Sequence, residues 1–162
     1  MDLKEYCYSL SKEKLSGLAL KLCDRAYAIW EGYCEATEVQ YRDTVIGELH
    51  IVNKSLLSDT LILCHNLQSE ANSDLFKNQA KAMLEKLLEP VTAIQDGDWN
   101  LPDHVEKTFY SVYNLIKGFD KPKSQFGELS HYLSVNQSVD AIYKSGLMSF
   151  DELKSFIYNI EK

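Results

Sequence analysis

A long apolar stripe near the start of the chain constrains the fold most strongly. Its residues recur at steps of three and four, the spacing that places side chains on one face of an α-helix. The stripe comprises Leu15, Leu18, Ala19, Leu22, Cys23, Ala26, Trp30, Tyr33 and Cys34. With Ser11 as its N-cap, the pattern predicts a helix that runs to about Thr37, preceded by a helical turn or two within residues 2–9.

A third helix is predicted over residues 41–69, where the same spacing continues through Val45, Leu49, Val52, Leu56, Leu63 and Leu67. Gly47 would mark a kink or a close crossing within it. Ser73 caps a fourth helix, and Pro90 should end or bend that helix near Glu89 because proline lacks an amide donor.

The remaining third of the chain predicts three more helices. The fifth begins at Pro102 and ends at Gly118, which is available as a left-handed cap. The sixth covers residues 125–145. The seventh opens with a capping box of Ser149 and Glu152, and its inward face should comprise Leu153, Phe156, Ile157 and Ile160.

These segments define the expected fold class. No stretch alternates apolar and polar residues long enough to demand a strand, and no linker divides the 162 residues. With 45% hydrophobic residues, a chain of this length buries roughly two-thirds of its unfolded surface. We therefore expect an all-α protein, a single-domain bundle of six or seven antiparallel helices over residues 1–162.

Charge and composition argue against several functional classes. The net charge is −7, and only two of the 17 basic residues are arginines, so neither nucleic acid nor an anionic membrane is an expected partner. The first ten residues lack a secretory pattern, and no apolar run is long enough to span a membrane. The four cysteines form no Cys-x-x-Cys pair, which favours buried thiols in a reducing cytoplasm over a disulfide framework.

Motifs for catalysis or cofactor binding are missing from the sequence. It contains no phosphate-binding glycine loop, dinucleotide turn or nucleophile elbow, and no two histidines stand at the three- or four-residue spacing of a helical metal site. The loop from Asp96 to Asn100 begins like a calcium loop but has Leu101 and Lys107 where glycine and glutamate are required. We predict no catalytic residue, metal or cofactor, and we interpret this loop as an acidic turn with an exposed or half-exposed Trp99.

Acidic residues are concentrated in two blocks, with net charges of −4 over residues 24–48 and −5 over residues 70–106. In one long helix, four carboxylates would form a single ridge: Asp24, Glu31, Glu35 and Glu38. Asp96, Asp98 and Trp99 would form a second patch, and Tyr27 and Tyr41 would add aromatic anchors. Such a surface favours capture of a basic partner; the alternative is a solvated face that keeps an acidic protein soluble.

The segment from Leu15 to Arg25 is followed by the aromatic Tyr27, Trp30 and Tyr33 and by the acidic Glu31 and Glu35. In these residues the sequence resembles small all-helical bacterial immunity proteins of polymorphic toxin systems, mainly over residues 11–67. The resemblance implies a cytoplasmic protein that binds a cognate toxin domain and blocks it without performing chemistry. An acidic inhibitor would suit a basic toxin such as a nuclease. Two alternatives stay open: a metal-dependent helical-bundle enzyme using His50 and His131, and a scaffold or oligomerisation domain.

Overall fold

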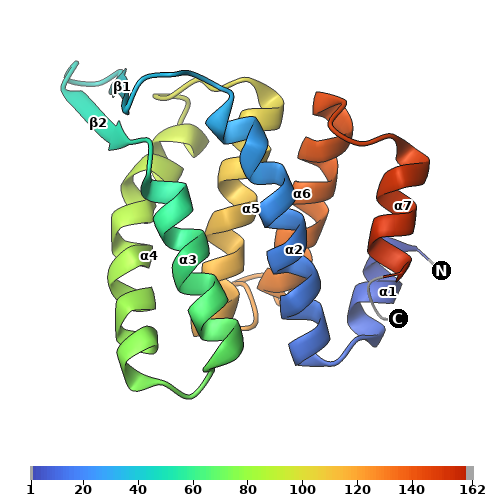
Figure 1. Cartoon of the computed structure of the whole chain (residues 1–162). Coiled ribbons are helices and arrows are strands. Elements are labelled where there is room, and N and C mark those ends of the chain that lie inside the picture. The colour runs from blue at the N-terminus through green and yellow to red at the C-terminus, as the bar shows by residue number, and fades with distance from the viewer. Residues whose placement is uncertain (1, 160–162) are drawn as a thin grey trace.

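The computed structural model describes residues 2–159, which form seven helices and one two-stranded hairpin (Figure 1). The helices are α1 (Leu3–Ser9), α2 (Lys12–Glu31), α3 (Leu56–Ser69), α4 (Asp74–Gln95), α5 (Asp103–Asp120), α6 (Ser130–Ser145) and α7 (Phe150–Asn159). The strands β1 (Glu38–Arg42) and β2 (Leu49–Asn53) lie between α2 and α3. The predicted all-α bundle is confirmed, with the hairpin as an addition that the sequence pattern did not indicate.

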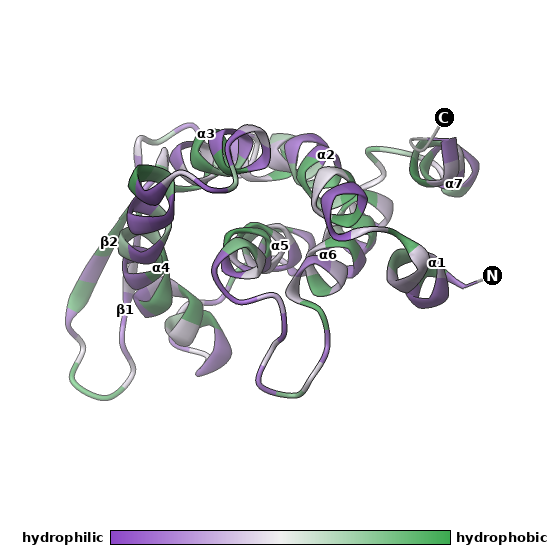
Figure 2. Cartoon of the chain, turned by 90° about the horizontal axis from the view of Figure 1, so that it is seen from below, coloured by the Kyte–Doolittle hydropathy of each residue, from purple (hydrophilic) through white to green (hydrophobic). Residues whose placement is uncertain are grey.

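Helix α5 occupies the centre of the bundle and packs against α2, α3, α4 and α6. Seen along the helices, α2 and α3 cover one side of α5 and α6, while α4 lies at the edge opposite α1 and α7 (Figure 2). Five apolar residues of α5 recur at helical spacing and are all buried: Val105, Phe109, Val112, Leu115 and Ile116. Their helical spacing therefore sets the position of this helix.

The predicted third helix over residues 41–69 is wrong in its first half, because residues 38–53 fold as a hairpin. Val39 pairs with Val52 and Tyr41 with His50, so that the inward face of the two strands is largely apolar. Gly47, with φ +69°, adopts the left-handed conformation in the connecting loop, which favours glycine. The helical spacing of Val45, Leu49 and Val52 is therefore not used.

Helix α2 ends at Glu31 rather than at Thr37, because the polypeptide turns at Gly32. The side chain of Lys54, just after β2, donates hydrogen bonds to the carbonyl oxygens of Glu31 (3.2 Å) and Cys34 (2.6 Å). The indole Nε1 of Trp30 donates to the carbonyl oxygen of Lys54 at 2.9 Å. These bonds satisfy polar groups at the helix end and fasten the hairpin to it.

Other boundaries also differ from expectation. Helix α4 continues through Pro90 to Gln95, because Val91 and Ile94 extend its buried face beyond the proline. Helix α6 begins at Ser130, after a loop, rather than at residue 125.

Gly118, expected as a C-cap, lies buried within α5.

The capping box of the last helix is confirmed: the amide of Glu152 donates to Ser149 Oγ at 3.2 Å, and the amide of Ser149 to Glu152 Oε1 at 3.4 Å. Leu153 and Ile157 are buried as predicted and Phe156 is partly buried, whereas Ile160 lies outside the described residues. Cys7, Cys23 and Cys64 are buried free thiols, and Cys34 is half-buried. Within residues 2–159, no helix combines the length and the apolar character needed to cross a membrane.

Candidate functional site

The end of the bundle that carries the hairpin concentrates negative charge. Two segments meet there, residues 30–55 and residues 89–106, and together they hold ten acidic residues and two Lys or Arg residues, a net charge of −8 with histidine counted as neutral, against −7 for the whole chain. Lys144 of α6 lies beside them and pairs with Asp103, with 2.9 Å between Nζ and Oδ2. We call this region the acidic end. Its carboxylates are Glu31, Glu35, Glu38, Asp43, Glu48, Glu89, Asp96, Asp98, Asp103 and Glu106.

A column of stacked rings joins the hairpin to the core. The ring of Tyr41 in β1 lies between His50, at a centroid distance of 5.0 Å, and Trp99, at 5.1 Å, and both pairs are close to parallel. Trp99 in turn contacts the edge of Phe109 in the central helix at 5.7 Å. Aromatic pairs with this geometry add about 0.5–1.5 kcal/mol each beyond the area they bury. The hairpin is therefore a fixed part of the fold.

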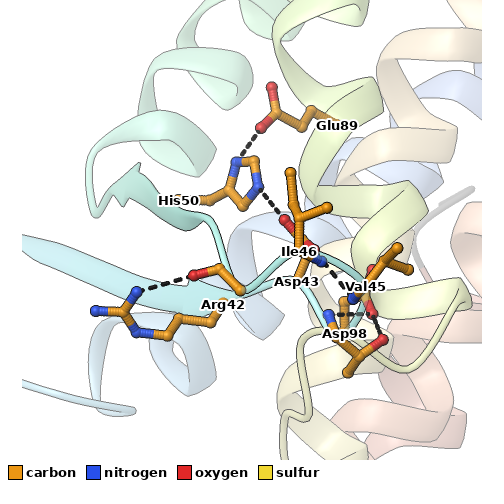
Figure 3. Close-up of polar contacts among 9 residues, drawn as sticks. Arg42, Asp43, Val45, Ile46, His50, Glu89 and Asp98 are labelled. Carbon is orange, nitrogen blue, oxygen red and sulfur yellow. Dashed lines mark hydrogen bonds and ion pairs between the residues drawn. The ribbon is translucent and has the colours of Figure 1, made fainter.

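His50 connects the hairpin to α4. Its Nδ1 lies 2.6 Å from a carboxylate oxygen of Glu89, and its Nε2 lies 3.4 Å from Asp43 Oδ2 (Figure 3). Partial burial lowers the pKa of His50, but hydrogen bonding to both carboxylates raises it, and the net result lies above the ordinary value of 6.5. These contacts favour the imidazolium over the neutral ring, and the charged ring links the two carboxylates.

The loop between the strands is held by hydrogen bonds. Asp43 Oδ1 accepts the backbone amides of Ile46 (2.7 Å) and Val45 (3.1 Å), and these bonds, the one from Ile46 foremost, lower the pKa of Asp43. Arg42 donates to the carbonyl oxygen of Gly47 at 2.9 Å. Thr44 donates from its amide (3.1 Å) and its hydroxyl (2.5 Å) to Asp98 Oδ1 in the loop after α4. The loop is thus pre-organised and attached to the bundle.

The predicted ridge of four carboxylates does not exist, because α2 ends at Glu31. Glu35 lies in the following turn, and Glu38 begins β1. Asp24 lies on α2 away from the hairpin and contacts His65 of α3, with 2.8 Å between Oδ2 and Nε2. Glu31, Glu35 and Glu38 are all exposed at the acidic end, so three of the four share a surface, although not a helix face.

The second predicted patch joins the first. Asp96 caps the end of α4 and is exposed, and Asp98 binds the hairpin loop as described. The expected exposed or half-exposed Trp99 is wrong: its side chain is 4% exposed, because it fills the space between Tyr41 and Phe109. Tyr41 is also buried. Both rings therefore support the surface from beneath, and neither is an exposed anchor for a partner.

Tyr27, the remaining predicted anchor, is half-buried and packs against the core. The link between His50 and Glu89 and the exposure of the loop residues Val45 and Ile46 were not predicted from the sequence. Polar and apolar residues alternate from Glu38 to Arg42, but these five residues are too short a pattern to demand a strand.

A metal site formed by His50 and His131 does not fit the structure. His131 packs beside Gly118 and Phe119, near the end of α5 remote from the hairpin, and its Nε2 lies 2.9 Å from the carbonyl oxygen of Leu115.

Among the described residues, Asp43, Glu48 and His50 bring possible ligand atoms within 4.8 Å of one another. Asp43 and His50 are already engaged in the loop and with α4, so these contacts account for the cluster structurally.

A small polar cleft lies beside the hairpin, between β2, the start of α3, and α4. Its volume is about 340 Å³, and its charged lining residues are His50, Asp59, Lys86 and Glu89. The cleft mixes both signs of charge, whereas the surface around the loop is predominantly negative. The larger and more uniform feature of this region is therefore the acidic end itself.

Comparison with known proteins gives one partial similarity. The chain is 27% identical over 119 residues to Protein SEY1 homolog 2 of Paramecium tetraurelia. The matched region covers 73% of this chain but 14% of that protein. No protein-family model matches the chain, and no solved structure matches it.

Proposed function

We propose that this protein is a non-enzymatic, cytoplasmic binding protein that neutralises a basic toxin domain through its acidic end. The observation that carries the proposal is the net charge of −8 on two segments that fold together around a fixed hairpin. The sequence resemblance to bacterial immunity proteins, mainly over residues 11–67, favours the same role, although residues 38–53 within it form a hairpin and not part of a second long helix. The toxin is a nuclease or another protein with a basic active surface.

The physical basis is electrostatic complementarity. A concentrated patch of one charge sign attracts an oppositely charged partner before contact and raises the association rate by about 10- to 1,000-fold at low salt. Carboxylates at such a patch can occupy positions on a nuclease that otherwise receive phosphates. Because His50, Tyr41 and Trp99 hold the hairpin in place, little ordering is required on binding, which lowers its entropic cost.

The first test is capture of the tagged protein with its partners from its native cells at low and at high salt, with identification of the bound proteins by mass. We expect a basic partner that is released as salt rises. Expression of this partner alone should arrest growth, and co-expression with the wild-type chain should restore it. A partner that is acidic, or one whose retention is independent of salt, would contradict the proposal.

The acidic end is then tested by charge removal. Glu35→Gln, Glu38→Gln and Asp96→Asn together neutralise three carboxylates at the acidic end. The matched control, Glu13→Gln, Glu70→Gln and Asp120→Asn, removes the same charge at the start of α2 and at the ends of α3 and α5. These helix ends lie at the end of the bundle opposite the hairpin (Figure 1). We expect the first variant to bind the partner about tenfold more weakly at low salt and the control to bind like the wild type. Equal weakening in both variants would indicate that only the total charge matters.

A further inference from the structure

The loop of the hairpin presents apolar side chains to solvent. Val45 is 89% exposed and Ile46 is 73% exposed, and on the outward face of β2 Leu49 and Ile51 are 42% and 56% exposed. We call these four residues the apolar tip. Single exposed apolar residues are common on protein surfaces, but four on one projecting hairpin form a patch of the kind found at binding sites.

The backbone that carries the apolar tip is fixed. The amides of Val45 and Ile46 are both bound by the Asp43 carboxylate, and Thr44 between Asp43 and Val45 is bound to Asp98 (Figure 3). These bonds fix the backbone of the loop against the bundle while the Val45 and Ile46 side chains stay exposed. A rigid loop with apolar side chains directed outward is pre-organised for insertion into a complementary pocket.

We propose that the apolar tip inserts into an apolar pocket of the protein partner and that the rim of this pocket is basic. The basic rim follows from charge complementarity, because the two acidic residues Asp43 and Glu48 of the loop outnumber the one cation beside it, Arg42, and the acidic end lies around the hairpin. The same charges disfavour a second copy of this chain as the occupant, since two acidic ends would face one another. This inference rests on the proposed function and adds the residues that supply the apolar part of the contact.

The experiment uses a photo-crosslinking amino acid in the full chain, expressed in its native cells. It is placed in turn at position 46 in the apolar tip, at position 35 in the acidic end, and at the exposed position 75 at the start of α4 as a control. We expect crosslinks from positions 46 and 35 to the same protein, and none from position 75. The peptide crosslinked to position 46 should be apolar and flanked by lysine or arginine on the surface of the partner.

The other outcomes separate the two proposals. Crosslinks from position 35 without any from position 46 would overturn insertion of the apolar tip while retaining the proposed function. Crosslinks from neither position would overturn both. A crosslink from position 46 to a second copy of the chain, or to a peptide without basic flanks, would also overturn the inference.

Purified components provide the second readout. In the variant Val45→Ser with Ile46→Ser, affinity for the crosslinked partner should fall at least tenfold through faster dissociation, while the salt dependence of association is retained. The matched control, Ile62→Gln with Leu75→Gln, removes two exposed apolar residues of α3 and α4 and should bind like the wild type. Both variants should keep the unfolding midpoint of the parent protein. Unchanged dissociation in the tip variant would overturn the inference.

Discussion

Substitution of Gly118 by alanine should destabilise the protein, although it removes a glycine from a helix. A Cβ atom at this position of α5 would lie 2.3 Å from His131 Cδ2 and 2.4 Å from Nε2. The His131 ring is confined, because it is buried, lies against Phe119 and has its Nε2 2.9 Å from the carbonyl oxygen of Leu115. The alanine therefore displaces a ring that the surrounding residues hold.

The magnitude follows from three opposing contributions. Replacing glycine by alanine in a helix favours folding by about 1 kcal/mol. Overpacking of a dense core costs about 1–3 kcal/mol. Loss of the hydrogen bond between His131 and Leu115 costs a further ~1 kcal/mol. The free energy of unfolding should thus fall by about 1–3 kcal/mol in Gly118→Ala.

The control is Gly17→Ala in α2, where the new Cβ would meet only Gln68 Nε2, at an ordinary contact distance of 3.4 Å. This variant should be more stable than the wild type by about 0.5–1 kcal/mol. Urea denaturation measures both changes. In a His131→Ala background, which removes the ring, Gly118→Ala should become neutral or stabilising. Gly118→Ala as stable as Gly17→Ala would refute the reasoning.

Three further predictions concern titrating groups. Burial lowers the pKa of His131 to about 4, so the stability that its neutral ring contributes above pH 6.5 is lost as the pH falls toward 4. Lowering the pH from 7 to 5 should therefore reduce the free energy of unfolding by about 2 kcal/mol, as measured by thermal or urea unfolding. The effect of His50 on stability runs in the opposite direction with pH. Its raised pKa contributes stability below pH 6.5, and this stability is lost as the pH rises through the raised pKa. The variant His50→Gln should abolish this pH dependence of the unfolding midpoint. A thiol reagent should modify Cys34 first in the native protein, because burial raises the pKa of Cys7 and Cys23 to about 11, and mass spectrometry of the labelled peptides checks this order.

The helices could be predicted from the sequence because each has one continuous buried face. The stripe from Leu15 to Trp30 and the inward residues of α5 are buried as their spacing requires. The capping residues Ser11, Ser73 and Ser149 accept the hydrogen bonds expected of them. These features are local, so neighbouring residues are sufficient to indicate them.

The hairpin could not be predicted by the same reasoning, because its apolar residues satisfy two periodicities. Val45, Leu49 and Val52 fit a helix, whereas Val39, Tyr41 and Val52 fit the buried face of two paired strands. The choice is made by contacts distant in sequence, such as Tyr41 with Trp99. Burial of the hairpin on the bundle therefore overrides the local pattern.

Because the hairpin was not predicted, the residues of the candidate site were also placed wrongly. The carboxylates were expected on one helical ridge and in a separate loop, but the turn after Glu31 brings Glu35 and Glu38 to the same end of the bundle as Asp96 and Asp98. The composition of the two acidic blocks was visible in the sequence. That the two blocks meet in the fold could not be predicted, because it depends on which loops contact one another. The same contacts bury Trp99, so that it supports the hairpin and is not a surface residue.

The most direct test of the central claim is the association rate of the purified chain and its partner, measured by stopped flow over a series of salt concentrations. We expect a steep fall of the rate with salt for the wild type and for the control Glu13→Gln, Glu70→Gln, Asp120→Asn. We expect a much shallower fall for Glu35→Gln, Glu38→Gln, Asp96→Asn. The same salt dependence in all three proteins would contradict a role for the acidic end in capturing the partner.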